Sequence, residues 1–210
     1  MLSAKRANAN KRNEHKKEFA KINHHFQIYI YTKVLFFSYI CIVNCSTTMK
    51  IGIISDTHNT FDEPLKEFLA PCDEIWHAGD FGSLELADEI AAFKPLRGVY
   101  GNIDGGIIRR VYPEFTLFEV EGVKVLMTHI GGYPRHYQPK ARQHIYTSRP
   151  KLFIAGHSHI LKVMYDNVYD LLHINPGAAG NYGIHHVRTA IRLDIENGEI
   201  KNLEIGEWNR

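Results

Sequence analysis

The chain has 210 residues, with 25 lysines and arginines against 23 aspartates and glutamates, so its formal net charge is only +2. A hydrophobic fraction of 44% and a charged fraction of 23% are ordinary for a globular protein and argue against wholesale disorder. Three cysteines cannot form a closed disulfide framework, which excludes a cystine-rich secreted scaffold. The near-neutral total charge gives no reason to expect a nucleic-acid-binding protein.

The first 48 residues differ from the rest of the chain. Eight basic and two acidic residues give this segment a charge of +6, so the remaining 162 residues carry −4. Residues 34–43 form an apolar run that is too short for the roughly 20 residues that span a bilayer. A signal peptide would also need a small-residue cleavage site, and a membrane anchor would need the whole run from Ile28.

Met49 and Lys50 stand directly before the first clear strand, where a native N-terminus would stand. We therefore expect residues 1–48 to be an extension that precedes the natural start, either disordered or a weak signal-like or anchor-like segment. Residues 49–210 are expected to form one domain. With a start at Met49 the protein is expected to be cytoplasmic, and only a genuine N-terminal segment would make it membrane-anchored or exported.

Strands and helices alternate in the first half of this domain. Apolar runs predict buried strands at residues 50–55, 74–78 and 97–100. Helical spacing of apolar residues predicts a helix over 62–70 with Asp62 as N-cap, and a second helix that runs from the N-cap Ser83 to Phe93. This order of elements implies parallel strand pairing with right-handed crossovers.

The second half is richer in strands. The segments 115–120 and 123–127 alternate about the Glu121-Gly122 turn and predict a hairpin. The remaining predicted elements are a helix over 137–148 and strands over 152–155, 162–166, 170–174, 187–195 and 199–205. The sequence thus predicts one α/β domain with two sheets, helices outside them, and loops gathered at the carboxyl ends of strands.

Polar side chains follow five of the apolar strands, usually beside glycine. They are Asp56 and His58 after the first strand, Asp80 after the second, Asn102 after the third, His129 after the strand over 123–127, and His157 and His159 after the strand over 152–155. Because the carboxyl ends of parallel strands face a common crevice, we expect these side chains to converge on one site.

Imidazole and carboxylate together suit Mn, Fe, Zn or Ni, and the lack of thiolate argues against a structural zinc cage. Seven ligands are too many for one ion. They suit two ions about 3.5–4 Å apart, with one carboxylate bridging them and an open edge for solvent.

These residues resemble the calcineurin-like metallophosphoesterase superfamily. The motifs Asp56-x-His58, Gly79-Asp80, Gly101-Asn102, His129 and Gly156-His157-x-His159 stand in the family order. The short chain and Asn175-Pro176-Gly177 are similar to the compact YfcE-like phosphodiesterase branch. The resemblance covers about residues 49–206 and implies a four-layer αββα sandwich of two mixed β-sheets flanked by helices.

The resemblance also implies a ligand set and a reaction. Asp56, His58, Asp80 and His159 would hold the first ion, and Asp80, Asn102, His129 and His157 the second, with Asp80 as the bridge. The ions would be divalent transition metals, with Mn²⁺ preferred and Fe, Zn or Ni as alternatives. A hydroxide bridging both ions would attack the phosphorus of a small phosphodiester, with Asp80, Asn102 and Arg135 as catalytic residues.

Two departures from the family pattern concern catalysis. Many members carry a histidine after the Gly-Asn, thought to protonate the leaving group, and here that residue is Ile103. The usual second histidine after His129 is also missing, and a Gly-Gly loop ending in Arg135 replaces it. Arg135 or His136 is a candidate to contact a substrate phosphate, and a solvated loop cation is an equal alternative.

Four further residues have less specific roles. His77 is expected either to orient a ligand or to be a packed strand histidine, and Asp104 to fix the Asn102 loop through backbone hydrogen bonds. His173 is expected to be a strand residue, and Cys72 an inert thiol.

The leading function is therefore a metal-dependent phosphoesterase, and the alternative is a non-catalytic interaction scaffold of the same fold, like the retromer subunit. The expected partner is a small phosphoester substrate rather than a nucleic acid or membrane. The sequence leaves open whether the protein forms a homo-oligomer.

Overall fold

Three parallel strands form one side of the first sheet. The structure, a computed structural model, describes residues 48–184 and 186–210. The strands β1 (Met49–Ile54), β2 (Glu74–His77) and β3 (Leu96–Gly98) pair in parallel, as predicted. On the other side of β1, β11 (Val187–Glu196) and β12 (Glu199–Asn209) pair antiparallel, which gives the order β12-β11-β1-β2-β3.

The second sheet is also mixed, with the order β4-β5-β8-β10-β9. Its central strands β5 (Val123–Thr128), β8 (Leu152–Ile154) and β10 (Leu171–Pro176) are parallel. The edge strands β4 (Phe115–Val120) and β9 (Leu161–Asp166) pair antiparallel with β5 and β10. The predicted hairpin is therefore one edge of this sheet.

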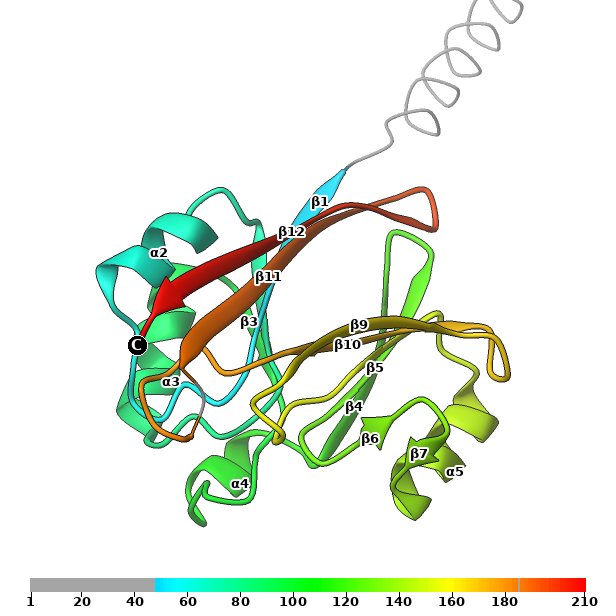
Figure 1. The fold of residues 1–210 in the computed structure, drawn as a ribbon, viewed down its shortest axis with the longest axis horizontal. Helices are drawn as coiled ribbons and strands as arrows, with labels where there is room; N and C mark the ends of the chain where they lie inside the picture. The colour runs from blue at the N-terminus through cyan, green and yellow to red at the C-terminus, as the bar shows by residue number, and fades with distance from the viewer. Residues whose placement is uncertain (1–47, 185) are drawn as a thin grey trace, which may run out of the picture. The chain divides into compact units, whose positions relative to one another are not determined.

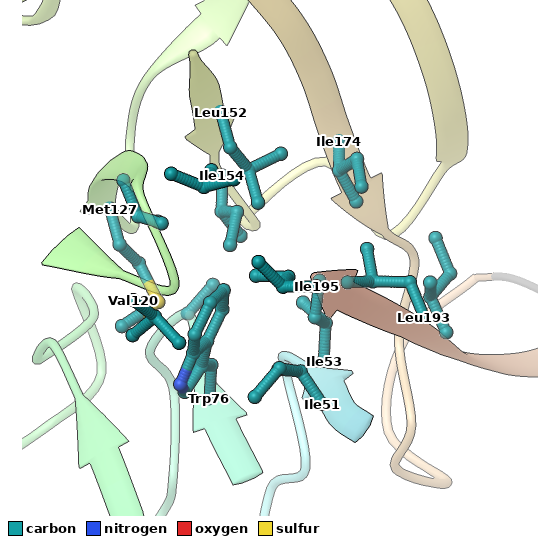
Figure 2. Packing of buried hydrophobic residues seen from close by; sticks show 14 of the residues in the cluster. Ile51, Ile53, Trp76, Val120, Met127, Leu152, Ile154, Ile174, Leu193 and Ile195 are labelled. Carbon is teal, nitrogen blue, oxygen red and sulfur yellow. The ribbon is translucent and has the colours of Figure 1, made fainter. Parts of the chain in front are cut away.

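An apolar layer fills the space between the two sheets. Figure 2 shows Trp76 of β2 pointing into this layer, opposite side chains of the second sheet. The layer includes Ile51, Ile53, Trp76, Val125, Met127, Leu152, Ile154, Ile174, Leu193 and Ile195. Because every one of these side chains is fully buried, the two sheets are held face to face by the hydrophobic effect.

Helices cover the outer face of each sheet (Figure 1). On the first sheet, α2 (Glu63–Leu69), α3 (Leu84–Phe93) and the single turn α4 (Ile108–Val111) contribute to a second buried cluster with Ile54 and Ile75. On the second sheet, Ala141 and Ile145 of α5 (Pro139–Ser148) pack with Leu126 and Phe153. The predicted four-layer αββα sandwich is confirmed.

One predicted helix begins later than expected. The helix predicted over 137–148 starts at Pro139, because proline is favoured in the first turn, where its missing N–H costs nothing. The residues before it form a small hairpin of β6 (Gly132–Tyr133) and β7 (His136–Tyr137) that the sequence analysis did not predict. Two-residue strands are too short to show a period of alternation.

The two predicted helix caps differ in chemistry. Ser83 caps α3 as predicted, because its Oγ accepts a hydrogen bond from the Leu86 amide at 3.2 Å. Asp62 stands at the N-cap position of α2, but its side chain makes no capping bond. Its carboxylate instead accepts two hydrogen bonds from the buried guanidinium of Arg188, at 2.6 and 2.8 Å.

The described residues from 48 onward form one compact unit. The expectations for residues 1–47 lie outside the described residues. In the part of the chain that the structure describes, no helix is long and apolar enough to cross a membrane.

A matched pair of valines tests the layer between the sheets. Val125 is fully buried, whereas Val163 on β9 is 40% exposed. Val125→Ala removes two buried methyl groups and leaves a cavity, so we expect it to lower the free energy of unfolding by about 2–3 kcal/mol. Val163→Ala should change it by less than about 0.5 kcal/mol. Denaturant unfolding measures both, and equal effects would contradict the layer described above.

The Asp62–Arg188 pair makes stability depend on pH. The hydrogen bonds and charge of Arg188 hold the pKa of Asp62 below its ordinary value of 3.8, against a smaller opposing effect of burial. A depressed pKa stabilises the folded state at neutral pH, and this contribution is lost as the pH falls below about 4.

We therefore expect Asp62→Asn to lower the free energy of unfolding by about 1 kcal/mol at pH 7, since the carboxylate is partly open to solvent. The difference from the wild type should be smaller at pH 3 than at pH 7. Unfolding curves at both pH values measure it, with Asp88→Asn on the exposed face of α3 as the control. A difference that stays constant with pH would contradict the assignment.

Candidate metal centre

The loops after five strands bring all seven candidate ligands together at one edge of the sandwich. Three of these strands belong to the first sheet and two to the second, so the site lies where the sheets meet. The side chains are Asp56 and His58 after β1, Asp80 after β2, Asn102 after β3, His129 after β5, and His157 and His159 after β8. Their convergence follows from parallel strands that end at a common edge.

The first cluster contains Asp56, His58 and His159. The Nε2 atom of His159 lies 3.1 Å from Asp56 Oδ1 and 3.5 Å from His58 Nε2. Burial lowers the pKa of His58, although Asp80 and Asp56 oppose this. A neutral imidazole keeps a lone pair on one nitrogen, which is the form that binds a metal ion.

The second cluster contains Asp56, Asp80 and His129. His129 Nε2 lies 3.3 Å from Asp80 Oδ1 and 3.0 Å from Asn102 Oδ1. The ring of His157 lies beside it, with the two ring centres 5.2 Å apart. The seven side chains therefore form two adjoining groups rather than one.

Two carboxylates stand between these groups. Asp56 belongs to both clusters. Asp80 directs one oxygen toward each imidazole, with Oδ1 3.3 Å from His129 and Oδ2 3.9 Å from His58. The sequence predicts a single bridging carboxylate, Asp80, and the geometry offers Asp56 as a second candidate.

The donor set fits a divalent cation. His129 Nδ1 lies 2.8 Å from the carbonyl oxygen of Ala78, which can only accept, so Nδ1 carries the proton. In the neutral ring the lone pair of Nε2 then faces the oxygens of Asp80 and Asn102, which are also acceptors. A cation among these atoms would satisfy all of them.

Two further observations agree with this fit. Within the described residues, Asp56 Oδ1 is buried and makes no hydrogen bond, although His159 Nε2 lies only 3.1 Å from it. Burial by itself would lower the pKa of His129, but hydrogen bonding to Asp80 and the charges of both carboxylates raise it above its ordinary value. The site therefore attracts positive charge to the place where the two clusters meet.

The backbone of the site is strained. Five of the seven candidate ligands have positive φ angles, which are uncommon for residues other than glycine. They are Asp56 (53°), His58 (45°), Asp80 (59°), His157 (71°) and His159 (57°). Such conformations persist only where the surrounding structure imposes them, and they concentrate at functional sites.

The carboxylate of Asp104 joins two loops of the site. Its Oδ2 accepts hydrogen bonds from the amides of Asp80 at 3.0 Å and Gly101 at 2.7 Å, and its Oδ1 accepts one from Gly82 at 3.1 Å. The predicted role of Asp104 is therefore confirmed. It fixes the turn that carries Asp80 against the loop that carries Asn102.

His77 supports the Gly79-Asp80 turn through hydrogen bonds. It is fully buried, and its Nδ1 accepts a hydrogen bond from the Gly79 amide at 3.1 Å. Its Nε2 therefore carries the proton and donates to Thr57 Oγ1 at 2.8 Å. Of the two roles left open by the sequence, the structure favours orientation of the turn.

The sequence analysis did not identify Arg109 and assigned no structural role to Asn175. Arg109 donates to the carbonyl oxygens of Asp104 at 2.8 Å and Asn102 at 3.1 Å, and so closes the loop after β3. No local signal marks it, because its partners are backbone groups. Asn175 donates to the Gly156 carbonyl at 2.8 Å, and the only signal for it was the Asn-Pro-Gly motif.

The side chains of Arg135 and Ile103 belong to neither cluster. Arg135 is exposed in the turn between β6 and β7, beside Asp166 and Val168, and it is not brought together with the seven candidate ligands. The side chain of Ile103 is 46% exposed, while its amide donates to Asp80 Oδ1 at 3.1 Å. Ile103 thus orients Asp80 through its backbone.

The fold and this edge of the sandwich define a known class of protein. Residues 49–198 match the calcineurin-like phosphoesterase superfamily domain. The chain belongs to this superfamily.

Known proteins of similar sequence and structure agree with this membership. A phosphodiesterase of Methanocaldococcus jannaschii is 29% identical over 171 residues, which cover 74% of this chain and 98% of that protein. The solved structure of an archaeal phosphodiesterase is 26% identical, with a TM-score of 0.60, and covers 75% of this chain and 100% of that one. Vacuolar protein sorting 29 from Cryptosporidium parvum shares the fold at 17% identity, with a TM-score of 0.57 over 78% of this chain and 99% of that one.

A pair of glycines tests the position of Asp80. A Cβ atom at Gly101 would overlap the carboxylate and the backbone nitrogen of Asp80, whereas a Cβ atom at Gly106 would meet nothing within 4 Å. Gly101→Ala should displace the carboxylate and weaken Mn²⁺ affinity about 10- to 100-fold, and Gly106→Ala should leave the affinity unchanged. Calorimetric titration of both variants with Mn²⁺ measures this, and equal affinities would contradict the close approach.

Proposed function

We propose that this protein is a metal-dependent phosphoesterase that hydrolyses small phosphodiesters with two divalent metal ions. The observation that carries the proposal is the convergence of seven oxygen and nitrogen ligands, from five strand ends, into two adjoining clusters. The phosphodiesterase named among the similar proteins supports the same reaction class.

The two clusters suggest how the ions are held. Asp56, His58, Asp80 and His159 would bind one ion, and Asp80, Asn102, His129 and His157 would bind the other. Mn²⁺ is the first choice because carboxylate, amide and imidazole ligands suit it, with Fe, Zn or Ni as alternatives. When bound, such a pair of ions would supply Lewis acidity, which would lower the pKa of water at the site and neutralise charge on the phosphoryl oxygens.

The chain's own residues hold this chemistry in place. Ala78 and Asp104 keep His129 and Asp80 oriented through hydrogen bonds, so little reorganisation accompanies the reaction. The side chain of Ile103 carries no proton that it could give to a leaving group. We therefore infer that the preferred substrates have good leaving groups, or that the leaving group receives its proton from solvent.

The charge of the domain favours small substrates. Residues 49–210 carry a net charge of −4, which opposes binding of a long phosphate backbone. A small phosphoester needs only the local positive charge of the bound ions. We accordingly propose a small-molecule substrate rather than a nucleic acid.

A protein-interaction scaffold of the same fold is the alternative. The similarity to vacuolar protein sorting 29, at 17% sequence identity, is evidence for a shared fold only. The convergence of carboxylates, imidazoles and an amide favours the enzyme, because a scaffold has no need for buried acceptors directed at one another.

Activity on an artificial diester tests the proposal. The Mn²⁺-loaded full-length protein should hydrolyse bis(p-nitrophenyl) phosphate, whose activated leaving group needs little acid assistance. Asp80→Asn removes one charge from the centre of both clusters, so kcat/KM should fall at least about 100-fold together with the metal content. Asp88→Asn on α3 is the matched control and should keep both.

Release of p-nitrophenol and metal analysis by mass spectrometry give the two readouts. Full metal content without turnover would contradict the phosphoesterase proposal and favour the interaction scaffold. Undiminished turnover in Asp80→Asn would overturn the ligand assignment.

A further inference from the structure

A separate cavity opens beside the proposed metal centre, on the outer face of the second sheet. Its volume is about 180 Å³. It lies between the β6–β7 hairpin, the loop after β8, and the strands β9 and β10. The residues that carry the argument are Ile130, Tyr133, His157, Ile160, Lys162 and His173, all of which line it.

The floor of the cavity holds an unsatisfied histidine. His173 of β10 is fully buried, and neither of its ring nitrogens has a hydrogen-bond partner in the ranges that the structure describes. Burial, reinforced by the charge of Lys162 and opposed by that of Asp166, lowers its pKa to about 4, so the ring is neutral near pH 7. A neutral imidazole offers one donor and one acceptor, and leaving both unpaired inside a protein is costly.

The mouth of the cavity is apolar and aromatic. Ile130, Tyr133 and Ile160 are 42%, 44% and 62% exposed, which is unusual for large apolar side chains that lie so close together. The ammonium group of Lys162 lies 4.0 Å from the centre of the Tyr133 ring and holds it in place by a cation–π contact. Apolar and aromatic side chains of this kind pack against the flat faces of a ligand ring. The imidazole of His173 suits polar atoms on the edge of that ring that enters the cavity.

The volume decides the size of that ring. An engineered protein cavity of about 150 Å³ accommodates benzene, so a cavity of about 180 Å³ takes one six-membered ring with its substituents. The second ring of a purine would extend from the cavity into its open mouth, so a purine would be enclosed less completely than a pyrimidine.

His157 connects this cavity to the proposed catalytic residues. His157 lines the cavity, its ring lies 5.2 Å from the ring of His129, and its amide donates to Asp56 Oδ2 at 3.1 Å. The cavity therefore adjoins the two clusters, and a group attached to a ring in the cavity can reach them.

We infer that this cavity is the subsite for the alcohol part of the ester, and that it selects a single heteroaromatic ring of pyrimidine size with its polar edge against His173. The inference rests on the proposed phosphodiesterase function, which it deepens. His173 is a specificity-determining residue here, and Tyr133 supplies the stacking face.

Equilibrium binding tests the subsite without catalysis. Uridine 5′-monophosphate and adenosine 5′-monophosphate are the probes, and the Mn²⁺-loaded full-length protein is titrated with each by calorimetry. The uridine compound should bind at least about tenfold more tightly. His173→Phe keeps a ring of similar size but removes both polar atoms, so it should weaken uridine binding about tenfold. His144→Phe on α5 is the control and should bind as the wild type does.

Stability separates this role from a structural one. Because Phe removes two unpaired polar atoms from an apolar site, His173→Phe should unfold at the same or a higher denaturant concentration than the wild type. Loss of uridine binding without loss of stability is the expected signature.

Ile160→Trp, at an exposed position in the mouth, is a second variant that should block binding and leave the fold intact.

The outcomes distinguish this inference from the proposed function. If bis(p-nitrophenyl) phosphate is hydrolysed but the two nucleotides bind equally, or if His173→Phe and Ile160→Trp both keep uridine binding, the subsite is overturned. If selective uridine binding depends on His173 but no ester is hydrolysed by the metal-loaded protein, the cavity assignment holds and the phosphodiesterase proposal fails.

Discussion

The apolar layer between the two sheets is the constraint on which the site depends. Neither sheet alone presents enough ligands, because three of the contributing strands lie in one sheet and two in the other. Side chains such as Trp76 and Ile154 are fully buried between them and fix how the sheets face each other (Figure 2). The positions of His129 and Asp80, on different sheets, are therefore set by hydrophobic packing some distance from any ligand.

That packing brings polar groups to the edge but does not orient them. Orientation comes from buried hydrogen bonds to backbone groups, above all those of Asp104 and His77. These contacts hold the loops in positive-φ conformations that would otherwise relax. Divalent ions would add to this support, since they would remove the repulsion between Asp56 and Asp80.

Much of this architecture could be predicted from the sequence. The run Ile51–Ile54 reads as a strand buried on both faces, and its parallel neighbours follow from the alternation with helices. The meeting of seven polar residues follows from their position at strand ends. What could not be predicted depends on contacts between distant segments. Asp62 looks like a cap until Arg188, 126 residues later in the chain, takes its carboxylate.

The same limit explains why His173 reads only as a strand residue. In sequence it is one polar residue in an apolar strand, and alternation places it on the face opposite Ile174. Only the fold shows that the hairpin at Gly132 and Tyr133 leaves a cavity over that face. A phenylalanine there would pack against Phe153 and Tyr137 without an unpaired polar group. A histidine therefore lowers stability at this position unless a ligand completes its hydrogen bonds, and that cost is the physical reason to regard the cavity as part of the site.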